Sequence, residues 1–275
     1  MKSKLLLAIV IIAAAGGIYY ALSGTKTPPD DGPKVPVPAQ LSVTLPPVNI
    51  YPHDTLSYTE GLEFYKGVLY ESAGEYKNSF VATYDYKTGK RLSYKKLPDD
   101  IFGEGMTILN DKLYMLTWKN KKMFVLDPVT FAETGSFPWT LGDGWGMTND
   151  GKSLIANTGG SSIFFLDPAT LKIQRTISVT DEYGPVSNVN EMEYVNGVIY
   201  ANIFETETII KIDPKDGRVL ARADLGSMYP EYNHVTDKAR VGGGRLMNGI
   251  AYNPDTKTFL LTGKNWPKMF EVRMN

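Results

Sequence analysis

The stretch Ile101-Phe102-Gly103-Glu104-Gly105-Met106-Thr107 places one carboxylate between two glycines, directly before a run of β-forming residues. Glycines on both sides let the backbone turn tightly and leave the carboxylate uncovered. The same three-residue frame recurs along the chain: a polar or aromatic residue, then usually Gly, then Leu, Met or Ile. Its five copies are Glu60-Gly61-Leu62, Glu104-Gly105-Met106, Trp145-Gly146-Met147, Asn190-Glu191-Met192 and Asn248-Gly249-Ile250.

Each copy of the frame opens a repeat unit, and successive copies lie roughly 40–45 residues apart, a period typical of propeller blades, except that the last spacing is longer. The frame is followed by a turn rich in Gly and Asn, a short β-rich run and a third, alternating run. In three units an Asp-Pro turn, beginning at Asp127, Asp167 or Asp213, leads to a fourth run. Four short antiparallel strands per unit make the blade of a β-propeller. The sequence therefore predicts an all-β fold, a five-bladed β-propeller.

The two ends of the repeat region predict how the ring closes. The fifth unit ends after its third run, Lys268–Met274, so one outer strand is missing. Val43–Tyr51 is β-rich and precedes the first unit, and we expect it to supply that strand and remove an exposed sheet edge. The longest insertion, Leu225–Leu246, contains three consecutive glycines and is predicted to be a mobile lid on the face where the frames begin.

The N-terminus has the pattern of a targeting segment. Lys2 and Lys4 precede the uncharged apolar run Leu5–Leu22, which predicts a signal peptide or membrane anchor over residues 1–23. Residues 24–40 are interpreted as a Pro-rich linker, and residues 41–275 as the catalytic propeller domain. Positive charge before the run predicts export to the periplasm or the extracellular space, with membrane contact only through an uncleaved anchor.

Composition excludes several classes of function. The net charge of −1 gives no basis for a nucleic-acid partner. The chain has no cysteine, which excludes disulfides, thiolate nucleophiles and iron–sulfur clusters. With only two histidines, His53 and His234, we expect neither a His-rich metal centre nor a Ser-His-Asp triad. The shortage of His and Cys accords with our expectation of no metal and no cofactor. We also expect a monomer, and both histidines are interpreted as ordinary surface or loop residues.

Strand direction predicts where the functional side chains meet. Innermost strands begin, and second strands end, on one face of the disc, so two rings of side chains should converge there. The first ring contains Glu60, Glu104, Trp145, Asn190 and Asn248, with Glu191 beside Asn190. The second ring contains Gly74, Trp118, Gly159, Phe204 and Lys264.

For some of these residues the sequence favours a functional role, and for others a structural one. An unpaired carboxylate is costly to bury, so Glu104 between its glycines is interpreted as functional, as is Lys264 beside Gly263. The Asp-Pro aspartates are interpreted as turn formers. For Phe102, Trp145 and Phe204, packing in the core and lining of a pocket are both open alternatives.

Seven motifs in order resemble those of the plant- and bacterial-type glutaminyl-peptide cyclotransferases, from about Tyr51 to the C-terminus. They are Thr59-Glu60-Gly61-Leu62, Phe102-Gly103-Glu104-Gly105-Met106-Thr107, Leu116-Thr117-Trp118, Gly144-Trp145-Gly146-Met147, Asn190-Glu191-Met192-Glu193-Tyr194, Leu246-Met247-Asn248-Gly249-Ile250-Ala251-Tyr252 and Thr262-Gly263-Lys264-Asn265-Trp266-Pro267. The resemblance implies a five-bladed propeller that takes peptides or proteins with N-terminal glutamine. It implies conversion of that residue to pyroglutamate with release of ammonia.

The resemblance also implies roles for individual residues. Glu104 would be the acid and base, and Lys264 and Asn190 would bind the developing oxyanion. The residues expected to bind substrate are Glu60, Phe102, Trp118, Trp145, Glu191 and Asn248. This chain departs from the family pattern at Glu60, where the family usually has Gln. A second carboxylate near Glu104 would raise one pKa or attract the substrate's ammonium.

Two other functions are compatible with the same residues. A calcium-dependent propeller lactonase or esterase could hold an ion with oxygens of Glu60, Glu104, Asn190 and Asn248, although such relatives have six blades. A non-catalytic propeller that binds a peptide is the other alternative.

Overall fold

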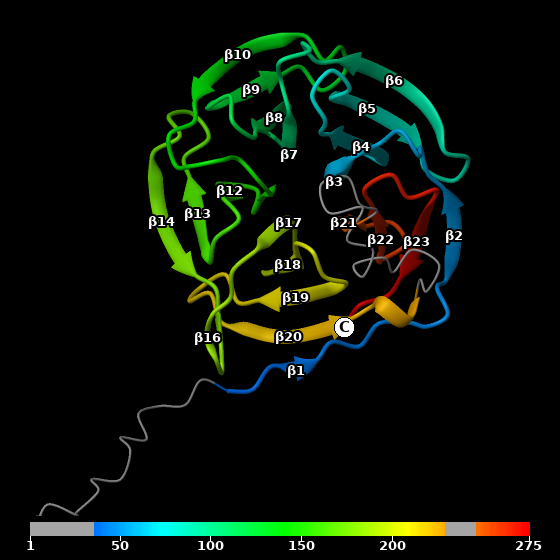
Figure 1. Ribbon diagram of the computed structural model, residues 1–275, viewed down its shortest axis with the longest axis vertical. Helices are drawn as coiled ribbons and strands as arrows, with labels where there is room; N and C mark the ends of the chain where they lie inside the picture. Colours follow the sequence, from blue (N-terminus) through cyan, green and yellow to red (C-terminus); the bar gives the residue numbers. More distant parts are fainter. Residues whose placement is uncertain (1–35, 229–245) are drawn as a thin grey trace, which may run out of the picture. The chain divides into compact units, whose positions relative to one another are not determined.

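The computed structural model describes residues 36–228 and 246–275. In these ranges the strands form five blade sheets around a central axis, together with one two-stranded ribbon (Figure 1). The predicted all-β, five-bladed propeller is confirmed. Among the described residues, no helix has the length and apolar character needed to cross a membrane.

The first three blades each contain four antiparallel strands, ordered from the axis outward. The first blade consists of β3 (Thr59–Tyr65), β4 (Val68–Ala73), β5 (Phe80–Asp85) and β6 (Lys90–Lys96). The second consists of β7 (Gly103–Leu109), β8 (Lys112–Thr117), β9 (Lys122–Leu126) and β10 (Glu133–Pro138). The third consists of β11 (Met147–Asn149), β12 (Leu154–Asn157), β13 (Ser162–Leu166) and β14 (Ile173–Ser178).

The last two blades take strands from the N-terminal segment. The fourth consists of β17 (Val189–Val195), β18 (Val198–Ile203), β19 (Thr208–Ile212), β20 (Val219–Asp224) and β1 (Ala39–Gln40). The fifth consists of β21 (Met247–Asn253), β22 (Thr258–Gly263), β23 (Lys268–Val272) and β2 (Asn49–Pro52). The ribbon of β15 (Thr180–Asp181) and β16 (Gly184–Pro185) and the 3₁₀ helix η1 (Gly226–Met228) complete the elements.

Burial along the strands follows from their distance to the axis. Every residue of the innermost strand β7 is buried, whereas the outermost strand β6 alternates between exposed and half-buried positions. Strands buried on both faces lose the alternating pattern that one solvated face imposes. This is why the units are more readily recognised by their frames and turns than by strict alternation.

The Asp-Pro turns have the structure that the sequence predicts. Asp127 Oδ1 accepts hydrogen bonds from the backbone nitrogens of Val129 and Thr130, at 3.0 and 2.8 Å. Asp167 Oδ1 binds Ala169 N and Thr170 N in the same way, at 3.0 and 2.9 Å. These aspartates connect the third and fourth strands of their blades and lie away from the axis.

The N-terminal segment follows the outside of the fourth and fifth blades (Figure 1). Strand β2 pairs in antiparallel register with β23, from Asn49 opposite Glu271 to Pro52 opposite Lys268. Val43 adds an isolated bridge to Met274. Before them β1 pairs in parallel with β20, so the folded unit, which begins at Pro36, includes the last residues of the segment interpreted as a linker.

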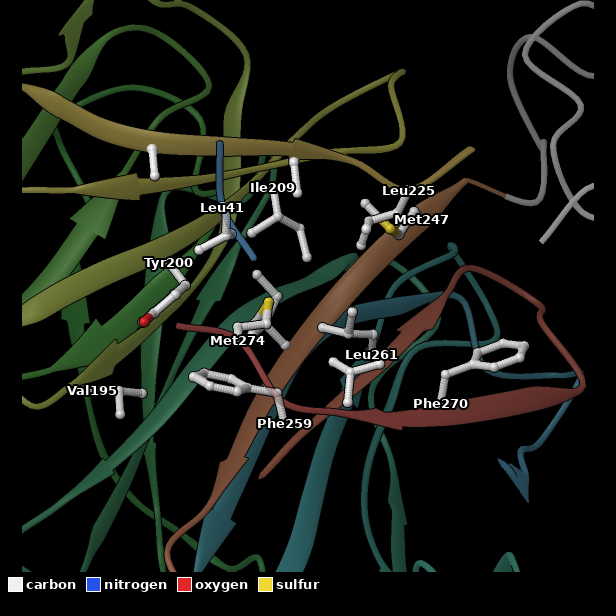
Figure 2. Close-up of a cluster of buried hydrophobic side chains, with 14 of the residues drawn as sticks. Leu41, Val195, Tyr200, Ile209, Leu225, Met247, Phe259, Leu261, Phe270 and Met274 are labelled. Carbon is white, nitrogen blue, oxygen red and sulfur yellow. The ribbon is translucent and has the colours of Figure 1, made fainter. Parts of the chain in front are cut away.

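A cluster of buried side chains anchors this segment between the fourth and fifth blades (Figure 2). Leu41, only 1% exposed, packs there with residues from both blades, among them Ile209 and Leu261. Full burial of a leucine side chain stabilises a fold by about 1.5–3 kcal/mol. The segment before β2 therefore contributes to stability.

Two predictions concern segments outside the described residues. The signal or anchor segment, residues 1–23, and the linker up to residue 35 belong to the first undescribed range. Residues 229–245 make up most of the predicted lid, Leu225–Leu246.

Truncation from the N-terminus tests these contributions. Relative to a chain that begins at Pro36, a chain that begins at Val43 lacks β1 and Leu41. Its melting temperature should fall by about 2–4 °C for each kcal/mol lost. A chain that begins at His53 also lacks β2 and should lose its cooperative transition, because β23 becomes an exposed edge. Equal melting curves for the chains that begin at Pro36 and at His53 would contradict the closure.

Candidate active site

The frames coincide with irregularities in the innermost strands. In β3, Thr59 lies opposite Ala73 but Gly61 lies opposite Ser72, so Glu60 is an extra residue. Similar register shifts occur at the frames of β7, β17 and β21. An extra residue bends the strand and re-aims a side chain. The bulges therefore explain how residues such as Glu60 and Glu104 leave the sheet pattern.

The frame glycines allow neighbouring blades to approach closely. A Cβ atom on Gly146 would lie 1.9 Å from the Asn190 carbonyl oxygen, and one on Gly105 would lie 2.5 Å from the Trp145 carbonyl oxygen. Both neighbours are backbone atoms of the next blade, which cannot move aside as a flexible side chain does. Glycine is required at these positions by space.

A ring of hydrogen bonds joins the blades at the same level, one between each pair of neighbours. In blade order, the bonds are Ser72 Oγ to Glu104 O at 2.7 Å, Gly105 N to Trp145 O at 2.8 Å, Asn157 Nδ2 to Asn190 O at 2.7 Å, Gly249 N to Asn202 Oδ1 at 3.0 Å and Asn248 Nδ2 to Thr59 O at 2.9 Å. Each bond involves a frame residue or its direct neighbour in the chain. These hydrogen bonds therefore fix the backbone that carries the first set of predicted side chains, those of the five frames.

A cavity of about 240 Å³ opens at this level. Ligand sites for drug-sized molecules usually have roughly 300–1,000 Å³, so this cavity suits a group as small as one amino-acid residue. Its walls are formed by Tyr58, Glu60, Glu75, Phe102, Glu104, Trp118, Trp145, Asn190, Phe204 and Lys264. The two rings predicted from strand direction therefore do converge.

Lys264 and Glu60 form a buried ion pair in the cavity wall. Lys264 Nζ donates to Glu60 Oε1 at 2.6 Å, and both side chains are at most 4% exposed. Asn248 Nδ2 lies 3.3 Å from the other oxygen of Glu60. The ammonium also lies 4.3 Å from the centre of the Tyr58 ring, a cation–π contact. Glu60 is thus held by two donors that favour its ionised form.

Glu104 is also buried, with only 5% of the residue exposed, but its electrostatic surroundings differ from those of Glu60. In the described part of the chain no group hydrogen-bonds to its carboxyl. Burial and the nearby charge of Glu60 raise the pKa of Glu104 well above its ordinary value, and Lys264 opposes this only in part. Burial also raises the pKa of Glu60, but the Lys264 charge and hydrogen bond counteract it directly. Of the two carboxyls, Glu104 is therefore the one prepared to hold and exchange a proton.

Aromatic rings form two walls of the cavity. Phe102 and Trp118 lie 5.4 Å apart between ring centres, and Phe102 also meets Tyr58 edge-on at 6.2 Å. On the other side Trp145 and Phe204 make an edge-on pair at 5.2 Å. Phe102, Trp145 and Phe204, for which core packing was an open alternative, line the cavity. Apolar walls exclude water and strengthen the electrostatic interactions inside.

Seven of the nine predicted site residues line the cavity, and two do not. Glu191 was expected to bind substrate, but its carboxylate oxygens accept hydrogen bonds from Leu62 N at 3.2 Å and Ile250 N at 2.8 Å. It replaces the frame glycine and ties the fourth blade to the first and fifth. Asn248 is turned toward Thr59 and Glu60, and supports the wall from behind.

Three residues were missed. Tyr58 and Glu75 line the cavity, and each adjoins a predicted position: Tyr58 is two residues before Glu60, and Glu75 follows Gly74. Both could have been found by extending the two predicted rings by one or two residues. His53 lies in a loop, as predicted, but it is not a surface residue, because its side chain is 3% exposed and lies against Glu71.

Fold and cavity together define a five-bladed propeller with a buried carboxyl, an ammonium and an amide at one aromatic-walled site, a set of groups suited to acid–base catalysis. A family model described as glutamine cyclotransferase matches residues 20–274. The chain belongs to that family.

Two relatives illustrate the similarity. The chain is 33% identical over 226 residues to a glutaminyl-peptide cyclotransferase of Arabidopsis thaliana, a match that covers 82% of this chain and 69% of the relative. The crystal structure of Myxococcus xanthus glutaminyl cyclase superposes with a TM-score of 0.77 at 28% identity. That superposition covers 86% of this chain and 98% of the other.

Replacing Glu60 by Gln tests the electrostatic description of the cavity. The variant loses the like charge beside Glu104 and leaves Lys264 as the nearest opposite charge, so the pKa of Glu104 should fall. Side-chain carboxyl resonances of ¹³C-labelled glutamates, followed with pH, measure this shift. Glu75→Gln is the matched control: Glu75 lines the same cavity but does not figure among the groups that perturb Glu104. An unchanged Glu104 titration in Glu60→Gln would contradict the description.

Proposed function

We propose that the cavity converts the N-terminal glutamine of a peptide or protein to pyroglutamate. The α-amine nitrogen attacks the γ-carboxamide carbon, the ring C–N bond forms, and the carbonyl oxygen becomes negative. The amine nitrogen then loses a proton, the carboxamide nitrogen gains one, and the C–N bond to it breaks to release ammonia. Because both reacting groups belong to one residue, catalysis consists of folding that residue and moving protons.

Glu104 is the group we assign to proton transfer. Its carboxyl faces the cavity with no hydrogen-bond partner among the described residues, and its raised pKa brings it nearer the working range of a general acid–base. It takes the proton from the attacking amine and returns it to the leaving nitrogen. The single observation that carries the proposal is the presence of Glu104, Lys264 and Asn190 in one residue-sized, aromatic-walled cavity.

Lys264 and Asn190 are assigned to the oxygen that becomes negative. The Lys264 ammonium has three donors, and its bond to Glu60 uses one. Asn190 is fixed through its backbone oxygen, which accepts a hydrogen bond from Asn157, and this leaves its side-chain amide for the substrate. Donors held in place before the reaction lower the barrier because they need no reorganisation. Phe102, Trp118 and Trp145 hold the side chain and exclude water.

The experiment is ammonia release from a short peptide with N-terminal glutamine. General acid–base catalysis contributes typically about 10²–10⁴-fold, so Glu104→Gln should lower kcat by that order. Lys264→Ala should lower kcat by about 10²–10³-fold, as loss of one oxyanion donor does elsewhere. Glu133→Gln on the exposed strand β10 is the matched control and should match the wild type. Circular dichroism checks that each variant is folded.

Other outcomes would favour the alternatives. Near wild-type turnover in Glu104→Gln would remove it from the reaction. Calcium-dependent activity on lactones would favour the lactonase interpretation. Binding of the peptide without ammonia release, even at high enzyme concentration, would favour a non-catalytic propeller.

We propose further that the propeller works outside the cytoplasm. The support is the pattern of Lys2, Lys4 and Leu5–Leu22, with positive charge before an apolar run. A reporter that is active only in the cytosol, fused after Gln40, should be silent. The same fusion without residues 1–23 should be active, and equal signals from both fusions would contradict export.

A further inference from the structure

Outside the cavity, His53 and Glu71 form a buried pair where the first and fifth blades meet. His53 follows β2, and Glu71 lies on β4. The His53 Nε2 atom is 3.0 Å from Glu71 Oε1, and the two side chains are 3% and 0% exposed. Neither residue lines the cavity, and the proposed mechanism uses neither of them.

The His53 side of the pair holds the turn that carries Lys264. The Nδ1 atom of His53 lies 2.7 Å from the Trp266 carbonyl oxygen, and His53 N donates to Pro267 O at 2.9 Å. Asn265 adds two bonds to the same loop, from its backbone nitrogen to Ser57 O at 2.7 Å and from Nδ2 to Thr55 O at 3.0 Å. The loop 53–57 is thus fixed along the turn 264–267.

The Glu71 side of the pair holds the strand that carries Glu60. Glu71 Oε1 accepts hydrogen bonds from Ser57 Oγ at 2.5 Å and from Thr59 Oγ1 at 2.7 Å. Thr59 is the residue directly before Glu60. The buried His53–Glu71 pair therefore hydrogen-bonds to residues that lie within two positions, in sequence, of both members of the Lys264–Glu60 ion pair.

The geometry also defines the protonation state of the histidine. A neutral imidazole has only one N–H, yet both ring nitrogens of His53 face acceptors, a carbonyl and a carboxylate. The Thr262 hydroxyl, 3.2 Å from Nδ1, donates to Lys268 O. Burial alone would lower the pKa of His53. The charge and hydrogen bond of Glu71, the hydrogen bond to the Trp266 carbonyl and the charge of Asp54 together raise the pKa above its ordinary value.

The charged groups around His53 come from each element packed near it. Glu71 on β4 is the strongest partner, and Asp54 in the same loop favours the cation and is itself paired with Arg91 of β6. Of the neighbouring elements, strand β3 carries Glu60, and the segment from β22 to β23 carries Lys264 and Lys268.

We propose that His53 and Glu71 are a positioning pair: the protonated imidazole holds the Lys264 turn against the Glu60 strand, so the cavity is correctly assembled only while His53 is charged. This inference rests on the oxyanion role proposed for Lys264. When His53 loses its proton, one of its two acceptors loses its donor. Below the ordinary histidine pKa of about 6.5, His53 is protonated and the Lys264 turn is fully held. This contribution is lost as the pH rises through the raised pKa of His53 in the folded protein. It should contribute an alkaline limb to the pH profile of kcat.

Two variants and the wild type test the pH dependence. Glu71→Gln removes the opposite charge, so His53 should lose its proton earlier and the alkaline limb of kcat should move to lower pH. His53→Gln should lower kcat about 10–100-fold, the effect of a small misplacement in an active site, with little change in KM and without that limb. In the wild type, NMR titration of His53 should give a pKa that coincides with the limb. A His53 pKa far from the limb, or an unmoved limb in Glu71→Gln, would overturn the proposal, and both tests hold even where His53→Gln does not fold.

Tyr51→Phe is the matched control for stability. It removes the 2.9 Å bond from the Tyr51 hydroxyl to Glu271 at the same blade closure, and should lower the melting temperature while leaving kcat and its pH profile unchanged. A shifted limb in this control would mean that any weakening of the closure has the effect, and would overturn a specific role for the pair.

A double-mutant cycle with Lys264→Ala separates this inference from the proposed function. If His53 acts through Lys264, the double variant His53→Gln/Lys264→Ala should be no slower than Lys264→Ala alone. Multiplied losses would overturn the positioning role. A wild-type kcat in Lys264→Ala itself would instead refute the oxyanion role on which the inference rests.

Discussion

The closed ring of hydrogen bonds between neighbouring blades is the constraint on which the rest of this structure depends. It runs through frame residues or their neighbours, such as Ser72 to Glu104 and Asn248 to Thr59. No blade can bury its innermost strand alone, so the five must close around the axis before that strand leaves water. Because the same backbone carries Glu60, Glu104 and Asn190, the fold and the cavity are fixed by one set of contacts.

Inside that ring, charge is arranged as one fixed pair and one exchangeable proton. Glu60 and Lys264 neutralise each other at 2.6 Å, whereas the Glu104 carboxyl has no comparable partner among the described residues. Two carboxyls whose surroundings push their pKa values apart commonly take different acid and base roles in a reaction. Glu191 shows the contrasting solution, since backbone amides of two other blades satisfy both of its oxygens.

The sequence predicted the fold and most of the cavity because both depend on local patterns that repeat. Frames, turn residues and strand order placed Glu104, Lys264 and Trp118 on one face of the propeller. They left open whether Phe102, Trp145 and Phe204 pack in the core or line a pocket. Glu191 and Asn248 occupy the same frames, but a bulge can direct a side chain to the cavity or to a neighbouring blade, and this depends on contacts distant in sequence. The burial of the His53 side chain could not be predicted, because its partner Glu71 lies on another strand and the carbonyl it contacts belongs to the other end of the chain.

The most direct measurement is a crystal structure of Glu104→Gln with a bound peptide that begins with glutamine. The account predicts the substrate's α-amine within hydrogen-bonding distance of residue 104, about 2.6–3.2 Å. It also predicts the γ-carboxamide oxygen against Lys264 Nζ and the Asn190 amide, with the aromatic rings around the side chain. A peptide whose N-terminal residue lies outside the cavity, or whose carboxamide oxygen points away from Lys264, would contradict it.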